Sequence, residues 1–171
     1  MNGIRTALVV GAGPAGLTSA LALRRAGVEV TVIERTPDWA AVGFAFTLQG
    51  PALRVLQRLG LLEAVLRAGH GGAGPMGRPP LLGPGFPVSV GIKRPVFNAV
   101  LAEAGDIRPR LGAGITAVDG TEVTLTDGSI DRYDLVIGAD GLNSTVRRLA
   151  FPAALVLQRR VVSYGGSSRL R

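Results

Sequence analysis

The feature that constrains the fold most is a glycine-rich turn between an apolar run and a helical pattern near the N-terminus. Residues 6–10, within a strand expected over residues 4–10, form a short apolar run of the kind that is buried on both faces in a parallel sheet. The turn Gly11-Ala12-Gly13-Pro14-Ala15-Gly16 follows without a gap, and residues 14–26 continue with helical spacing. A second strand-like run, residues 28–33, leads to Glu34. This order of strand, turn, helix and strand predicts the first unit of a parallel α/β sheet.

Each glycine of this GxGxxG turn has its own physical role. Gly11 permits the tight turn, Gly13 lets backbone N–H groups approach a pyrophosphate, and Gly16 lets the helix pack closely on the strand. The helix N-terminus adds a partial positive charge for phosphate groups. Glu34 is placed to accept hydrogen bonds from an adenosine ribose and would repel a 2′-phosphate. The unit predicts a site for FAD or NAD rather than NADP, the alternative being a turn that holds no ligand.

The N-terminal stretch also has the length of a membrane span. No charged side chain occurs from Thr6 to Leu23, which meets the usual threshold of about 18 apolar residues, and Arg5 precedes the run as in a signal peptide. The glycines and Pro14 interrupt the run at its middle, where a membrane helix would gain nothing from them. We therefore expect a soluble, cytoplasmic protein that does not contact a membrane.

The next part of the chain alternates helical patterns with an irregular stretch. Leucines recur near one face of a helix expected over residues 52–66. Residues 68–91 are rich in Gly and Pro and predict an irregular crossing with one short strand. The single histidine, His70, lies there and is expected to be solvated. Residues 95–104, entered through Lys93-Arg94, predict a shorter helix. Its inward side chains are expected to be Val96, Phe97, Val100 and Leu101.

Three strand-like runs then predict a small antiparallel unit. They cover residues 115–118, 122–126 and 129–133, and the pairs Asp119-Gly120 and Asp127-Gly128 separate them. Asp-Gly between such runs is a strong hairpin signal. We therefore expect a β-meander inserted into the nucleotide-binding fold.

A second apolar strand follows the meander and carries another motif. It begins after Asp134 and runs into the turn Gly138-Ala139-Asp140-Gly141. Asp140 thus lies at the carboxyl end of a strand, where open α/β sheets bind ligands. Ser144 is placed to cap a helix that begins near Thr145. The alternative for Asp140-Gly141 alone is a plain turn.

Composition excludes several kinds of chemistry. The 171 residues contain no cysteine and one histidine, so a disulfide framework, a cysteine-ligated metal and a thiol nucleophile are excluded. The net charge of +7 arises mostly after Asp140, where six arginines and no acid occur, whereas residues 1–140 hold thirteen basic and twelve acidic groups, a net of +1. No aromatic interleaving or nucleic-acid motif accompanies this basic tail. We predict no nucleic-acid partner, no metal site and no catalytic side chain, and we expect the chemistry to come from a cofactor.

Together these motifs resemble the flavin-dependent aromatic hydroxylases, the single-component FAD monooxygenases of the para-hydroxybenzoate hydroxylase type. The resemblance is carried by Gly11–Gly16 with Glu34-Arg35, by Arg94 opening a helix, and by the run from Gly138 to Arg147. Residues 43–48 followed by 52–56 are also similar to the loop and helix of that family. The resemblance covers nearly all of residues 4–148. It implies an α/β, Rossmann-like FAD/NAD(P)-binding fold with an inserted antiparallel β-meander.

The resemblance also implies roles for individual residues. It places Gly11, Gly13 and Gly16 along the FAD pyrophosphate and Glu34 on the adenosine ribose. It places Arg35 alongside the adenine.

It also implies that Arg94 reaches the pyrophosphate and ribityl region and that Ile115 contacts the adenine from the meander. Asp140 belongs to the motif that the family uses for the FAD and NAD(P)H pyrophosphates. Because a carboxylate repels phosphate, we interpret Asp140 as ordering its turn, with Arg147 as its partner. In the family, NAD(P)H reduces the flavin, and a hydroxyl group derived from O₂ passes to a small, electron-rich aromatic substrate.

The sequence departs from the family at its C-terminal side. A third family motif, Gly-Asp with small residues and a histidine, does not occur, so we expect the fold to be C-terminally incomplete. We assign residues 1–148 to the N-terminal portion of an FAD-binding domain. Residues 149–171 are a basic tail or the start of a missing substrate domain.

Three functions follow from this pattern. The first is the FAD-binding portion of an aromatic-ring monooxygenase. The second is a non-catalytic, truncated nucleotide-binding remnant, and the third is the NAD-binding Rossmann domain of a dehydrogenase. The sequence leaves open whether this chain alone is an enzyme.

Overall fold

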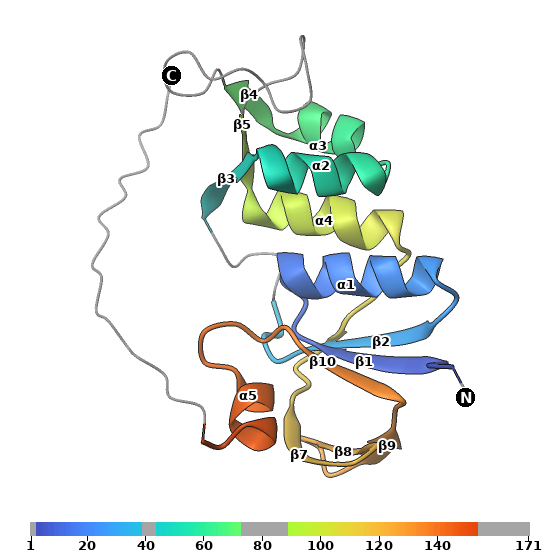
Figure 1. Cartoon of the computed structure of the whole chain (residues 1–171). Coiled ribbons are helices and arrows are strands. Elements are labelled where there is room, and N and C mark those ends of the chain that lie inside the picture. Colours follow the sequence, from blue (N-terminus) through green and yellow to red (C-terminus); the bar gives the residue numbers. More distant parts are fainter. Residues whose placement is uncertain (1–2, 39–43, 73–88, 154–171) are drawn as a thin grey trace.

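The computed structural model describes residues 3–38, 44–72 and 89–153. Within these residues, helices cover one face of a parallel sheet and an antiparallel meander covers the other (Figure 1). Residues 154–171, most of the expected tail, lie outside the described part. None of the helices among the described residues combines the length and apolar character needed to cross a membrane.

The parallel sheet has four strands and contains the motif-bearing segments. Its order is β10 (Leu135–Gly138), β1 (Thr6–Val10), β2 (Glu29–Glu34) and β6 (Arg110–Leu111). Val9 pairs with Val32 on one side and with Ile137 on the other. The three strands expected around the two motifs are confirmed, whereas the two-residue β6 was not predicted.

Strand β1 has an apolar side chain on each face because both faces of the sheet are covered. Ala7 and Val9 pack among the helices, while Leu8 and Val10 pack among the meander residues. All four are at most 5% exposed. This double burial is what a continuous apolar run in a parallel strand predicts.

The helical face is built by α1 (Pro14–Arg25), α4 (Arg94–Ala104), α2 (Gly50–Arg58) and α3 (Leu62–Ala68). The single helix expected over residues 52–66 is wrong. Gly60 has a φ of +62°, and its N–H donates to the carbonyl of Gln57 while the N–H of Leu61 donates to that of Leu56. This pattern is a Schellman motif, which ends α2.

Helix α4 is confirmed, but one of its expected inward residues is not. Phe97 and Leu101 are buried, whereas Val96 is 36% exposed. Asn98 is only 2% exposed and occupies the buried face instead. The helix turns by about 100° per residue, so the inward positions set by Phe97 and Leu101 leave Val96 on the flank.

A second antiparallel sheet was missed by the sequence analysis. It has the order β3 (Ala45–Gln49), β5 (Ser89–Lys93) and β4 (His70–Gly72). The expected loop over residues 43–48 is therefore a strand from Ala45 onward, and residue 43 lies outside the described part. Phe46 and Leu48 face the core while their neighbours are exposed, which is the alternation of a half-buried strand.

The same sheet changes the interpretation of residues 68–91. Both described ends of this stretch are strands, and residues 73–88 lie outside the description. His70 pairs with Gly91 in β4, and its side chain is exposed.

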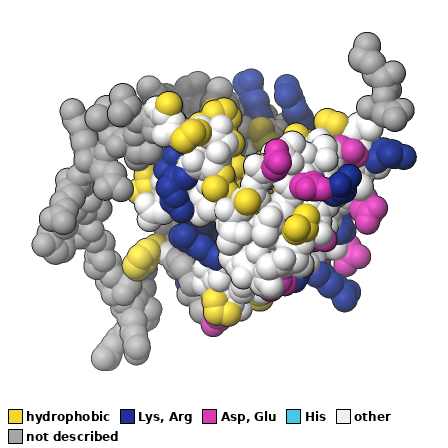
Figure 2. Space-filling view, turned by 90° about the horizontal axis from the view of Figure 1, so that it is seen from below, with side chains coloured by type: hydrophobic (Ala, Val, Ile, Leu, Met, Phe, Trp, Pro, Cys, Tyr) yellow, Lys and Arg dark blue, Asp and Glu magenta, His cyan; other side chains and the backbone are white. Residues whose placement is uncertain are grey.

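The β-meander is confirmed as three antiparallel strands, β7 (Ile115–Asp119), β8 (Glu122–Leu125) and β9 (Ile130–Arg132). Gly120 and Gly128, the glycines of the two Asp-Gly turns, have positive φ values of +56° and +84°. Val123 and Leu125 are buried against the sheet. Figure 2 views the molecule from this side and shows acidic side chains gathered on one half of the face, interleaved with basic ones.

We expect Gly16→Ala to destabilise the fold by about 1–3 kcal/mol, since overpacking in a well-filled interior has that cost. A Cβ at Gly16 would lie 1.8 Å from the carbonyl oxygen of Gly11, which belongs to the backbone and has little freedom to move away. Urea unfolding followed by circular dichroism measures the loss. Gly3→Ala is the matched control, because a Cβ there meets nothing within 4 Å. Equal stability of the two variants would contradict the close packing.

We expect Asp134 to make the stability depend on pH in acid. Its Oδ2 accepts hydrogen bonds from the N–H groups of Arg5 (2.8 Å) and Thr6 (2.9 Å), which tie the start of β1 to the start of β10. These bonds hold the pKa of Asp134 below its ordinary value of 3.8. The unfolded chain therefore takes up the proton first, so this stabilisation is present above the ordinary value and is lost as the pH falls through the folded-state pKa.

For Asp134→Asn, thermal melts between pH 7 and about pH 3 provide the measurement, because the affected window lies below the ordinary carboxyl pKa. We expect the variant to melt below the wild type at pH 7 and to approach it as the pH falls. A difference that is constant over the whole range would show that the carboxylate charge plays no part.

Candidate nucleotide-binding cleft

The carboxyl ends of β1, β2 and β10 open into a cleft of about 420 Å³. The start of α4 and the connection into β7 complete its walls. Seven of the eight predicted site residues line it: Gly11, Gly13, Glu34, Arg35, Arg94, Ile115 and Asp140. Gly16 does not line the cleft and lies behind it, against Gly11. The structure thus brings together residues more than a hundred positions apart in the sequence.

The glycine turn forms the floor of the cleft. Gly11 has a φ of +107°, and its N–H donates to the carbonyl of Ile33 at 2.8 Å. A Cβ at Gly11 would lie 2.4 Å from the carbonyl oxygen of Ala139, so the two motif-bearing turns touch through their backbones. Gly13 then precedes the first residue of α1 in an extended conformation. The first turn of α1 itself carries no acidic side chain, so its positive end can attract an anionic ligand.

Arg94 lies over this helix end. A Cβ at Gly13 would be only 3.2 Å from Nη2 of Arg94. The backbone of Arg94 is fixed by an N–H bond to the carbonyl of Phe44 at 3.1 Å. In the part of the chain that the structure describes, no carboxylate lies within ion-pair distance of this guanidinium. A guanidinium above a helix N-terminus is suited to a phosphate group.

Glu34 connects the end of β2 to the glycine turn. Its Oε2 accepts from the N–H of Ala12 and its Oε1 from the N–H of Thr36, each at 2.9 Å. Each oxygen keeps a further lone pair, so the carboxylate can also accept from a ligand hydroxyl. Arg35, the next residue, is exposed at the margin of the cleft.

Asp140 orders the turn that follows β10. Its Oδ1 accepts from the hydroxyl of Ser144 at 2.5 Å, and its Oδ2 accepts from the N–H of Thr145 at 2.5 Å. Ser144 caps α5 (Thr145–Ala150) as predicted, because its Oγ accepts from the N–H of Arg147 at 2.9 Å. The expected partnership of Asp140 with the Arg147 side chain is wrong. That guanidinium donates to the carbonyl of Leu142 at 2.7 Å.

The remaining wall comes from residues that the sequence analysis did not single out. Gly114 and Thr126 line the cleft beside Ile115. Ala113 also lines it, and its N–H donates a hydrogen bond to the carbonyl of Glu34 at 3.1 Å. Most of these positions present backbone rather than a chemically distinctive side chain. The sequence carries no signal for them beyond their closeness to Ile115 and to the Asp127-Gly128 turn.

Comparisons with known proteins agree with this geometry. A family profile described as "FAD binding domain" matches residues 5–77. The chain is 34% identical to 2-heptyl-3-hydroxy-4(1H)-quinolone synthase of Pseudomonas aeruginosa over 164 residues, covering 87% of this chain and 43% of that protein. It is also 34% identical to 3-amino-4-hydroxybenzoate 2-monooxygenase of Streptomyces cremeus, covering 82% of this chain and 40% of that one.

Solved structures give the same picture. A tetrameric form of 2-methyl-3-hydroxypyridine-5-carboxylic acid oxygenase superimposes with a TM-score of 0.75 at 27% identity, covering 88% of this chain and 43% of the other. The tetracycline destructase Tet(51) gives a TM-score of 0.70 at 28% identity, covering 86% and 42%. The chain spans less than half the length of these relatives. The chain is thus similar to FAD-dependent aromatic-ring monooxygenases over less than half of their length, and its residues 5–77 match an FAD binding domain.

Proposed function

We propose that the cleft binds FAD and that the chain is the cofactor-binding portion of a monooxygenase that hydroxylates a small aromatic substrate with NAD(P)H and O₂. The observation that supports this most is the position of the Arg94 guanidinium over Gly13, at the N-terminus of α1, whose first turn carries no acidic side chain. A dinucleotide carries its two negative charges at the pyrophosphate, which is the group that such an end attracts. The family profile supports FAD in particular.

The residues present fit this cofactor along the whole cleft. Gly11 lets its turn lie against the backbone of Ala139, and Gly13 places no side chain beneath Arg94, so a pyrophosphate can approach the backbone there. Arg94 donates to the phosphate oxygens. Glu34, held in place by the N–H groups of Ala12 and Thr36, accepts from the ribose hydroxyls.

The adenine then lies at the end of the cleft between β2 and the meander. Arg35 borders this end on the β2 side, and Ile115 borders it on the meander side. Asp140 acts on the ligand indirectly. Its carboxylate accepts hydrogen bonds at the start of α5 and fixes the turn that faces Gly11.

When bound, the flavin supplies the redox chemistry with O₂, and the protein contributes binding and orientation. The printed names of two relatives describe enzymes acting on a hydroxybenzoate and a hydroxypyridine carboxylic acid. We therefore propose a ring activated by hydroxyl or amino groups as the substrate. We also propose that residues 149–171 are the beginning of the substrate-binding part. The proposed location is the cytoplasm, where NAD(P)H is available.

We expect purified protein to bind FAD and to quench its fluorescence on titration. Arg94→Gln should weaken binding by about tenfold or more, since hydrogen bonds to charged groups contribute roughly 1.5–3 kcal/mol. Arg54→Gln is the matched control, because Arg54 is exposed on α2 and does not line the cleft. Failure of the wild type to bind FAD would overturn the proposal, and selective binding of NAD would favour a dehydrogenase domain.

Activity is tested separately from binding. Faster oxidation of NADH or NADPH by the FAD-loaded protein when a phenol or aminophenol is added, followed by absorbance at about 340 nm with product analysis, would exclude the nucleotide-binding remnant. FAD binding without stimulation by any aromatic compound would instead support the nucleotide-binding remnant.

A further inference from the structure

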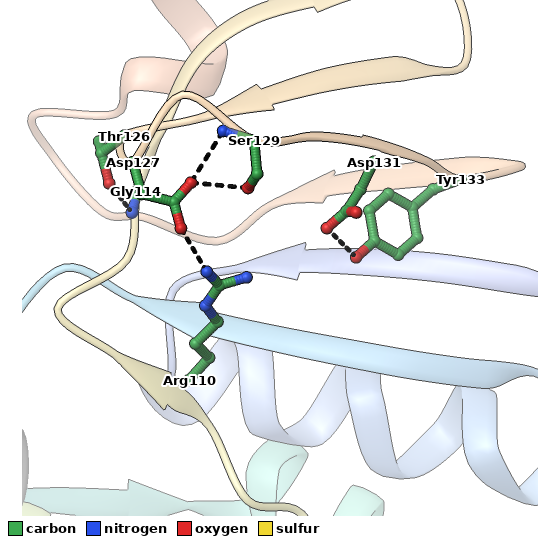
Figure 3. A network of polar contacts seen from close by, with 7 residues as sticks. All are labelled: Arg110, Gly114, Thr126, Asp127, Ser129, Asp131 and Tyr133. Carbon is green, nitrogen blue, oxygen red and sulfur yellow. Dashed lines mark hydrogen bonds and ion pairs between the residues drawn. The ribbon is translucent and has the colours of Figure 1, made fainter.

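The meander contacts the parallel sheet beside the cleft through a polar network (Figure 3). Nη2 of Arg110, on β6, lies 2.5 Å from Oδ2 of Asp127, in the turn between β8 and β9. The other oxygen of Asp127 accepts from the N–H of Ser129 at 3.0 Å and from its hydroxyl at 2.6 Å. These two bonds and the Arg110 guanidinium hold the pKa of the Asp127 carboxyl below its usual range. The carboxylate is thus fixed by its own turn and presented to Arg110.

The wall of the cleft lies one residue away from this ion pair. Thr126 precedes Asp127 and is bonded in both directions to Gly114. The N–H of Gly114 donates to Oγ1 of Thr126 at 3.1 Å, and the N–H of Thr126 donates to the carbonyl of Gly114 at 3.0 Å. Both residues line the cleft.

The other end of the ion pair is anchored to the strand that carries Glu34. In the register of β2 and β6, Arg110 lies opposite Ile33 and Leu111 lies opposite Glu34. The N–H of Ala113 donates to the carbonyl of Glu34. The backbone of Arg110 therefore pairs with β2 on one side of the cleft, while its side chain contacts Asp127 of the meander on the other side.

The pair contributes little to holding the meander on the sheet as a whole. Val123, Leu125 and Ile115 do this through burial, each at most 5% exposed. The side chains of Arg110 and Asp127 are 49% and 52% exposed, and pairs at such positions add little to global stability. The place of the pair is local, because Asp127 follows Thr126 at one end of the cleft and Arg110 lies on β6, which pairs with β2.

We propose that Arg110 and Asp127 are positioning residues for the nucleoside end of the cleft. Their ion pair sets the spacing between Glu34 at the end of β2 and the wall formed by Gly114 and Thr126. It thereby sets the affinity for the adenosine half of the ligand. This inference rests on the proposed binding of FAD and adds to it two residues that do not themselves line the cleft.

The test compares Arg110→Gln with a variant of a second ion pair on the same meander. Arg132 and Glu122 form that pair between β9 and β8, and neither residue lines the cleft. Dissociation constants for FAD and for ADP are measured by calorimetry on the full chain. We expect Arg110→Gln to weaken both ligands by about three- to tenfold and Arg132→Gln to change neither by more than about twofold.

Four further readouts separate positioning from general destabilisation. Arg110→Lys keeps the charge and should restore most of the affinity. The ligand-free melting temperatures of the two Gln variants should match. The difference between wild type and Arg110→Gln should shrink in about 1 M salt, which screens exposed charges. Amide exchange at Thr126 should be faster in Arg110→Gln, whether or not a ligand binds.

The outcomes distinguish this inference from the proposed function. If the wild type binds neither FAD nor ADP, the proposed function fails. If the wild type binds both and Arg110→Gln binds them equally well, the positioning role fails. The role also fails if Arg132→Gln weakens binding as much, or if Thr126 exchange is unchanged in Arg110→Gln.

Discussion

The contact of α1 with β1 through Gly16 is the constraint on which the site depends. The Gly16 Cα stands so close to the Gly11 carbonyl that no side chain fits between them. This approach aims the N-terminus of α1 at the carboxyl ends of the strands. Gly13 then lies under Arg94, and Gly11 lies against Ala139. A helix set farther from the strand would separate Gly13 from Arg94.

The charge balance of the cleft follows from what its acids already bind. Glu34 and Asp140 line it alongside Arg35 and Arg94, so the formal charges cancel. Both carboxylates, however, accept hydrogen bonds from backbone N–H groups, which disperses their negative charge into the protein. The guanidinium of Arg94 has no such partner among the described residues. An anionic ligand therefore meets a cleft that is more positive than a count of its charges indicates.

The parts of the fold that could be predicted are those with strong local signals. The glycine turn, the Asp-Gly hairpins and the capping Ser144 each need one residue type at one position, and the structure has them as expected. The strand over Ala45–Gln49 also has a local signal, since Phe46 and Leu48 alternate with exposed residues, but the family resemblance predicted a loop there. The break at Gly60 also had a visible signal, since a glycine interrupts a leucine stripe there.

Other features depend on tertiary contacts that no local pattern carries. The side chain of Arg147 has carbonyls and a carboxylate within reach, and only the folded turn decides that it bonds Leu142. Asn98 is buried on a face that hydrophobic periodicity assigns to apolar residues. Strand β6 is two residues long and exists because β2 offers an edge for pairing. The wall of the cleft formed by Ala113, Gly114 and Thr126 depends on tertiary contacts in the same way.

The pairing of β1 with β10 has a consequence for how the site comes into being. Leu8 pairs with Val136, so the central strand receives this neighbour only after more than 120 further residues have been added. The glycine turn leaves the ribosome early, but the turn that closes over Gly11 is translated nearly last among the described residues. During synthesis the chain must keep Leu8 and Val9 from other partners until that strand arrives. Non-local closure of this kind slows folding, and the cleft lacks the wall that follows β10 until residue 140 has emerged.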